Sequence, residues 1–86
     1  MVSSKKNRKA FMRSKLKELV FKREQAEQRR IFQNEIAEKT GLTPGTISRW
    51  MSPRPIRQIQ DDVVIPLCEF FQCDIGDLVT IEYSDD

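Results

Sequence analysis

The stretch 33–50, QNEIAEKTGLTPGTISRW, constrains the fold of this chain more than any other. Gly41 lies where a first helix must close with a left-handed residue, a conformation that costs about 1–2 kcal/mol for residues with a Cβ and almost nothing for glycine. Thr43 suits the N-cap of a following helix, and Pro44 suits its first position, where a missing N–H loses no bond. The stretch therefore predicts two short helices joined by a sharp turn, the second starting at Pro44.

Apolar residues within the same stretch predict how the two helices pack. Ile36, Leu42, Ile47 and Trp50 form an apolar seam, which places Trp50 in the core and not on a base-stacking surface. Ala37 lies where the first helix passes closest to the second, so a larger side chain there would separate them.

These residues together resemble the helix-turn-helix, residues 33–51, of the lambda repressor and Cro-like (Xre) family, whose second helix enters the DNA major groove. The resemblance covers roughly residues 15 to 83. It includes a pattern found in one branch of the family, formed here by Leu67, Cys68, Cys73, Asp74, Ile75, Gly76, Asp77, Leu78 and Tyr83. It implies an all-α, five-helix lambda-repressor-like domain with a basic N-terminal arm and a short extended C-terminal tail.

The resemblance also implies which residues meet base edges. The matching positions are Pro44, Gly45, Ser48 and Arg49 on a recognition helix at about 44–51. Pro44 and Gly45 offer only apolar contact or close backbone approach, whereas the family often has an amide there. Arg49 can donate two bonds to guanine O6 and N7, worth about 1–3 kcal/mol of discrimination. The alternative for Arg49 is an exposed arginine that holds a phosphate or nothing.

Other residues are candidates for positioning contacts with the phosphate backbone. Residues at helix starts and basic residues in loops and termini bind phosphate oxygens without selecting a sequence. The candidates are Gln33, Thr43, Thr46, Arg54, Arg57, Lys5, Lys6, Arg8 and Lys9. The last four could lie along the minor groove, or could belong to a solvated tail.

The charge distribution supports binding to nucleic acid without reference to any family. All 15 Lys and Arg lie between Lys5 and Arg57 with only five acids, a net charge of +10 for that segment. From Gln58 to Asp86 there are eight acids and no basic residue. A field of this sign attracts phosphate to one part of the chain, although an ordinary solvated surface is the simpler alternative.

Hydrophobic periodicity predicts the remaining organisation: a disordered basic arm over 1–10 and a single domain over 11–86. Phe11 or Met12, Leu16, Leu19 and Val20 recur at helical spacing and predict a first helix. This helix either continues through 22–30, which the strong helix formers favour, or ends near Arg23 and leaves a loop. Phe32 replaces the usual Ser or Thr cap of the second helix, and we expect it to pack as an anchor.

The chain after Trp50 predicts a loop, a helix and an extended end. Two closely spaced prolines after Ser52 end the helical pattern and leave Arg54 and Arg57 in a loop. An apolar face at helical spacing predicts a helix capped near Asp61; it consists of Val63, Val64, Leu67, Phe70 and Phe71. Val79, Ile81 and Tyr83 alternate with polar residues, which indicates either a strand with a possible dimer contact or a bare extended tail.

Several function classes find little support in the composition. The chain has no histidine and no Gly-rich phosphate loop, so we expect no catalysis and no cofactor. Cys68 and Cys73 cannot form a zinc set and are expected to be reduced core thiols, and the carboxylates match no calcium loop. No stretch is long and apolar enough for a membrane span, and MVSSKKNRKAF lacks a signal-peptide core, so we expect a cytoplasmic protein.

The sequence therefore predicts a non-enzymatic protein that binds double-stranded DNA sequence-specifically, as a homodimer and as a transcriptional regulator that represses by occupying an operator. The alternative is an antitoxin or protein-binding adaptor. In that case the acidic half from Gln58 to Asp86 would bind a small protein partner, and DNA binding would be secondary.

Overall fold

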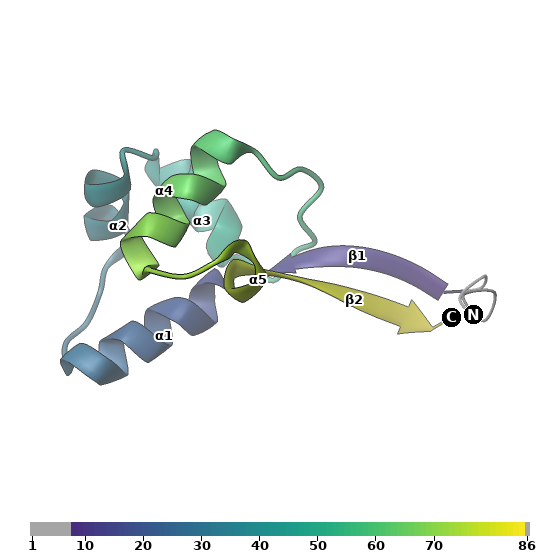
Figure 1. The fold of residues 1–86 in the computed structure, drawn as a ribbon, viewed down its shortest axis with the longest axis horizontal. Coiled ribbons are helices and arrows are strands. Elements are labelled where there is room, and N and C mark those ends of the chain that lie inside the picture. Colours follow the sequence, from purple (N-terminus) through teal and green to yellow (C-terminus); the bar gives the residue numbers. More distant parts are fainter. Residues whose placement is uncertain (1–7, 86) are drawn as a thin grey trace.

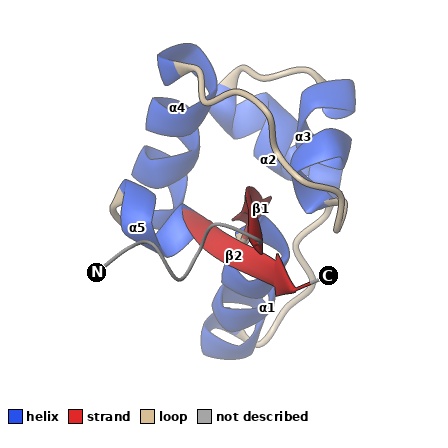
Figure 2. Ribbon diagram, turned by 90° about the vertical axis from the view of Figure 1, so that its right-hand side faces the viewer, coloured by secondary structure: helices blue, strands red, loops and turns tan. Residues whose placement is uncertain are grey.

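The computed structural model describes residues 8–85, which form five helices and two strands (Figure 1). In chain order the elements are β1 (Arg8–Ser14), α1 (Leu16–Glu27), α2 (Gln33–Thr40), α3 (Pro44–Met51), α4 (Asp61–Phe71), α5 (Ile75–Leu78) and β2 (Val79–Asp85). The helices gather into one body, and the two strands extend away from it to one side. Figure 2 looks along the strands, with α4 and α5 on one side and α2 and α3 on the other.

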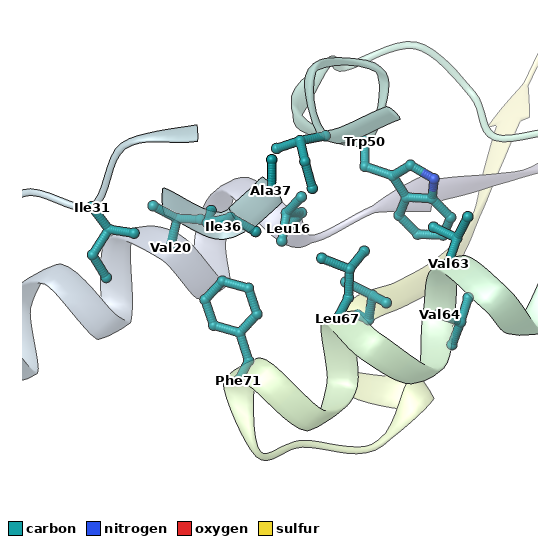
Figure 3. Close-up of a cluster of buried hydrophobic side chains, with 12 residues drawn as sticks. Leu16, Val20, Ile31, Ile36, Ala37, Trp50, Val63, Val64, Leu67 and Phe71 are labelled. Atoms are coloured by element: carbon teal, nitrogen blue, oxygen red, sulfur yellow. The ribbon is translucent and has the colours of Figure 1, made fainter. Parts of the chain in front are cut away.

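One cluster of buried apolar side chains joins all five helices (Figure 3). Trp50 of α3 faces Val63 at one end of α4, and Phe71 at the other end of α4 points toward Val20 and Ile36. The cluster contains Leu16, Val20, Ile31, Ile36, Ala37, Ile47, Trp50, Val63, Val64, Leu67, Phe71 and Leu78. Burying a side chain the size of leucine or isoleucine contributes about 1.5–3 kcal/mol, so this cluster holds the helices in place.

The predicted turn of the helix pair is confirmed in its details. Gly41 ends α2 with φ of 78°, and its N–H donates to the Ala37 carbonyl at 2.9 Å. Thr43 is the N-cap of α3, where its side chain accepts a bond from the Thr46 N–H, and Pro44 is the first helical residue. The apolar seam is also confirmed, because Ile36, Ala37, Ile47 and Trp50 are buried and Leu42 packs against them.

The prediction of an all-α fold is wrong, because β1 and β2 form a two-stranded antiparallel sheet. Phe11 and Met12, predicted in the first helix, lie in β1 opposite Glu82 and Ile81 of β2. The strand alternative for the C-terminal end is therefore confirmed. A backbone bond from the Lys15 N–H to the Leu78 carbonyl, at 2.6 Å, fixes the sheet to the helical body.

The predicted disordered arm over 1–10 is corrected at its end. Residues 8–10 belong to β1, where they lie opposite residues 83–85 of β2. The rest of the predicted arm, including Lys5 and Lys6, lies outside the described residues.

The first helix follows the longer of its two alternatives but stops before residue 30. It ends at Glu27 because Gln28 adopts a left-handed conformation, with φ of 54°. The connection that follows returns Ile31 to the core, where the Ile31 N–H donates to the Glu24 carboxylate at 2.8 Å. The start of this helix lies at Leu16, whose N–H donates to the buried hydroxyl of Ser14 at 3.0 Å.

Three smaller expectations also differ from the structure. Phe32 is not a core anchor, since 59% of it is exposed, and the Arg30 guanidinium lies over its ring. The N-cap of α4 is Gln60, whose side chain makes no capping bond. Asp61 is instead the first residue inside the helix, where its negative charge interacts favourably with the positive end of the helix dipole. The two cysteines are free thiols that are half-buried at the edge of the core and not inside it.

Candidate nucleic-acid interface

Helix α3 presents one apolar face to the core and its opposite face to solvent. Ile47 and Trp50 point inward and are nearly inaccessible. Pro44, Gly45, Ser48 and Arg49, the four predicted base-contact residues, are all exposed. This division follows from helical geometry, because Ile47 and Trp50, three apart, share the inner face, whereas Gly45, Ser48 and Arg49 share the outer one. Pro44 is exposed because it begins the helix.

The start of α3 holds its two threonines in a defined arrangement. The Thr43 hydroxyl oxygen accepts from the Thr46 N–H at 3.2 Å, and its proton is donated to the Thr46 hydroxyl oxygen at 3.0 Å. Thr43 is thereby occupied as a helix cap, whereas the Thr46 hydroxyl keeps its own proton for another acceptor. Gln33, the first residue of α2, is exposed. Of these phosphate candidates, Thr46 and Gln33 are the better placed to donate outward.

Three of the predicted arginines line one groove beside α3. Arg49 from the helix and Arg54 and Arg57 from the following loop surround a space of about 560 Å³. The other lining residues are uncharged: Trp50, Pro55, Ile56, Gln58, Gln60 and Val63. A groove with three guanidinium groups and no carboxylate suits a phosphate-rich ligand, because arginine binds phosphate through paired N–H donors.

The loop that carries Arg54 and Arg57 is held in position by the first strand. The Ile56 N–H donates to the Met12 carbonyl at 2.8 Å, which forms an isolated antiparallel bridge between the loop and β1. Within the loop, the Arg54 N–H donates to the Ser52 hydroxyl at 3.2 Å. The arginine loop is thus tied to both the sheet and the end of α3. No local motif indicated this bridge, because its two residues lie far apart in the chain.

Four other arginines, Arg13, Arg23, Arg29 and Arg30, are engaged with protein groups. Arg13 pairs with Glu82 at 2.8 Å and with Glu18 at 3.2 Å, and the hydrogen bond to Glu82 is the main cause of its raised pKa. Arg23 donates to the Phe70 carbonyl at 2.7 Å and lies over the rings of Phe70 and Phe71.

The loop before α2 binds its arginines in the same way. Arg29 contacts both Glu35 and Glu27 at 2.8 Å, and the hydrogen bond from Arg29 lowers the pKa of Glu35. Arg30 lies 4.0 Å from Glu24. Between residues 9 and 84, by contrast, Arg49, Arg54 and Arg57 form no ion pair. Uncompensated arginine charge therefore gathers at the groove beside α3.

The remaining phosphate-contact candidates belong to the N-terminal segment, far in sequence from the residues of this groove. Lys9 is an exposed residue of β1, Arg8 begins the same strand, and Lys5 and Lys6 lie outside the described residues. Gln58 and Gln60, which no sequence motif singled out, line the groove with the arginines. Their amides can donate to and accept from a base edge or a phosphate, so they join the candidate interface.

Between residues 9 and 84, no three cysteine or acidic side chains are grouped so that they could hold a metal ion. No helix in that range is long and apolar enough to cross a bilayer.

Comparison with known proteins agrees with this geometry. Residues 23–84 match the family model of the Cro/C1-type helix-turn-helix DNA-binding domain. A crystal structure of a "putative DNA-binding protein" from Bacteroides fragilis is similar in fold, with 26% sequence identity and a TM-score of 0.56. That match covers 80% of this chain and 98% of the other. Comparison with curated proteins finds no match.

Proposed function

The chain belongs to the Cro/C1-type helix-turn-helix DNA-binding family, a non-enzymatic regulator fold, and we propose that it binds specific double-stranded DNA sequences and represses transcription. The observation that carries this proposal is the groove beside α3, where Arg49, Arg54 and Arg57 gather without a carboxylate. In the proposed complex, α3 lies in the major groove and Arg49 reads a guanine. Repression follows from occupancy, because a domain bound at an operator blocks access to the DNA.

The other candidate residues have distinct tasks in this complex. Pro44, Gly45 and Ser48 face the base edges, and Gly45 permits close approach because its position lacks a side chain. Gln33, Thr46, Arg54 and Arg57 bind phosphates, and Thr43 supports them as the cap of α3. Lys5, Lys6, Arg8 and Lys9 add electrostatic attraction from the N-terminal end of the chain.

We propose that the regulator acts as a two-fold dimer that contacts half-sites about 34 Å apart. The apolar face of the sheet supports this, because the register places Ala10 and Met12 opposite Tyr83 and Ile81 on one face. Ile81 is 60% exposed and Tyr83 47% exposed. Sedimentation velocity of Ile81→Glu tests the contact: a monomer is expected, and an unchanged dimer with an intact circular dichroism spectrum would exclude this face.

The central experiment is selection of bound sequences from a random duplex pool at about 150 mM salt. Wild type is expected to enrich a palindrome. Arg49→Ala is expected to lose the guanine preference at one base pair of each half-site, at a cost of about 1–3 kcal/mol. Arg54→Ala removes the same charge from the same groove but is expected to weaken all sequences alike, with a salt slope reduced by about one unit.

A lysine outside the groove of Arg49, Arg54 and Arg57 provides the control. Lys22 is an exposed residue of α1 that lines one hollow with Gln72 and Asp77 and another with Ser52 and Pro53, but it does not line that groove. Lys22→Ala should leave the selected sequence unchanged and should reduce the salt slope less than Arg54→Ala does. If Arg49→Ala and Arg54→Ala lowered the affinity for every DNA sequence equally, Arg49 would have no base-reading role. Selection that enriches no sequence would overturn specific binding itself.

A further inference from the structure

A second groove lies between α4 and α5. It is separate from the groove beside α3 that Arg49, Arg54 and Arg57 line, called the arginine groove below. The second groove is open and shallow, with a volume of about 990 Å³, and apolar and thiol groups line much of it: Ile59, Val64, Ile65, Cys68, Cys73 and Ile75. Ile65 is 53% exposed and Ile75 is 48% exposed. Large aliphatic side chains left this open on neighbouring elements are typical of a binding surface, because their burial by a partner is favourable.

Four carboxylates line the same groove; we refer to them as its rim and to the apolar and thiol side chains as its floor. Asp61 and Glu69 of α4 and Asp74 and Asp77 around the start of α5 line the groove, and no basic residue does. The Asp74 N–H donates to the Asp77 carboxylate at 3.2 Å within a capping box, so this pair of acids is held in place. Over residues 9–84, none of the four carboxylates forms an ion pair. The groove therefore offers negative charge that no ion pair among residues 9–84 neutralises.

The two thiols keep the floor itself uncharged. Partial burial, and then the neighbouring Cys73, raises the pKa of the Cys68 thiol to about 11. Burial also raises the pKa of Cys73. Both side chains are neutral near pH 7 and act as small apolar groups there. The surface thus combines an apolar floor with an anionic rim.

We propose that this groove binds an amphipathic helix of a partner protein, with apolar side chains on the floor and Lys or Arg against the rim. A helix fits because the groove follows α4, whose 11 residues span roughly 16 Å, and because neither strand of the sheet lines it. This is the helix-in-groove mode of recognition, and the rim adds charge complementarity. A second copy placed by a two-fold axis would set four carboxylates against four.

A pair of synthetic peptides tests the proposal on the full-length chain. Each has about 14 residues, roughly 21 Å as a helix, with leucines at positions i, i+3, i+4 and i+7. One peptide carries lysine at the remaining positions and the other carries glutamate. The lysine peptide is expected to bind at least about tenfold more tightly by fluorescence anisotropy. The amide chemical-shift changes that this peptide causes in the ¹⁵N-labelled protein should be confined to the residues of α4 and α5 that line the groove.

Variants of α4 identify the contacts. Ile65→Ser is expected to weaken the lysine peptide about five- to tenfold, because half of an isoleucine surface is no longer buried. Glu69→Gln should weaken it about two- to fivefold, the range for an exposed ion pair. Asp62→Asn removes another exposed charge from the same helix, outside the groove, and should leave affinity unchanged.

Several results would overturn the proposal. Equal binding of the two peptides, equal losses from Glu69→Gln and Asp62→Asn, or shift changes centred on α3 would each show that the groove does not select a cationic helix. A dimer that Ile65→Ser converts to a monomer in sedimentation velocity would show that a second copy occupies it. These readouts use no DNA, so they stand or fall separately from the proposed operator binding.

Discussion

The two glycines that flank the start of α3 allow the energetic basis of the turn to be measured. Gly41 has φ of 78°, whereas Gly45 lies inside α3 with no positive φ. A Cβ added at either position would meet no atom within 4 Å. The two sites therefore share open surroundings and differ in backbone conformation, so alanine at each one isolates the cost of the left-handed residue.

Gly41→Ala is expected to lower the free energy of unfolding by about 1–2 kcal/mol, the cost of placing a Cβ in the left-handed region. Bonds on both sides hold this conformation: the Gly41 N–H donates to the Ala37 carbonyl at 2.9 Å, and the Leu42 N–H donates to the Thr40 hydroxyl at 3.3 Å. The strain cannot relax without breaking them. For a domain of this size, 1 kcal/mol corresponds to roughly 4–8 °C in Tm, so a fall of roughly 4–16 °C is expected.

Gly45→Ala is the matched control and should change stability in the opposite direction. Alanine in a helix is favoured over glycine by up to about 1 kcal/mol, less near the first turn, so Tm should rise by a few degrees. Gly41→Asn should fall between wild type and Gly41→Ala, because asparagine tolerates the left-handed region. Thermal unfolding by circular dichroism measures all three. An unchanged Tm in Gly41→Ala, or an equal loss in Gly45→Ala, would refute backbone strain as the cause.

Three further predictions follow from the buried groups. Leu78→Ala, at the fully buried last residue of α5, should cost about 2–5 kcal/mol in urea unfolding. Ser14→Ala removes the buried acceptor of the Leu16 N–H and should cost about 0.5–2 kcal/mol in the same assay. In the folded protein the pKa of Cys68 is raised to about 11 from 9.0. The neutral thiol therefore contributes stability that is fully present below pH 9 and is lost as the pH rises to about 11. Cys68→Ala should reduce this alkaline loss of Tm, and the same pH dependence of Tm in wild type and variant would contradict the raised pKa.

The helix-turn-helix was predictable because each of its determinants is local. Gly41, Thr43 and Pro44 act through their own backbone conformations and through bonds to residues a few positions away. The sheet was not predictable in the same way. Met12 fits a helical period with Leu16, and only its pairing with Ile81 shows that it belongs to a strand. Such pairing joins segments from opposite ends of the chain. The alternation of Val79, Ile81 and Tyr83 indicated the second strand, but no local pattern in 8–14 indicated its partner.

The end of α1 shows a second limit. Helix propensity correctly favoured continuation past Arg23, yet propensity alone does not indicate where α1 stops. The stop at Glu27 depends on tertiary contacts, since the chain must reverse to bury Ile31 and to bond its N–H to Glu24. The candidate site shows the same division: the exposure of Arg49 was predictable from the motif, whereas its proximity to Gln58 and Gln60 depends on the path of the loop.

The partition of arginines explains how a chain with a small formal charge can carry a basic groove. Glutamates and a backbone carbonyl engage Arg13, Arg23 and Arg29 at distances of 2.7–2.8 Å, so much of the positive charge stabilises local structure. Acids in the second half line the α4–α5 groove and not the arginine groove. The bridge from Met12 to Ile56 then fixes the arginine loop against β1. A variant that breaks β1 should therefore weaken DNA binding without touching an arginine, because Arg54 and Arg57 would lose their fixed position beside α3.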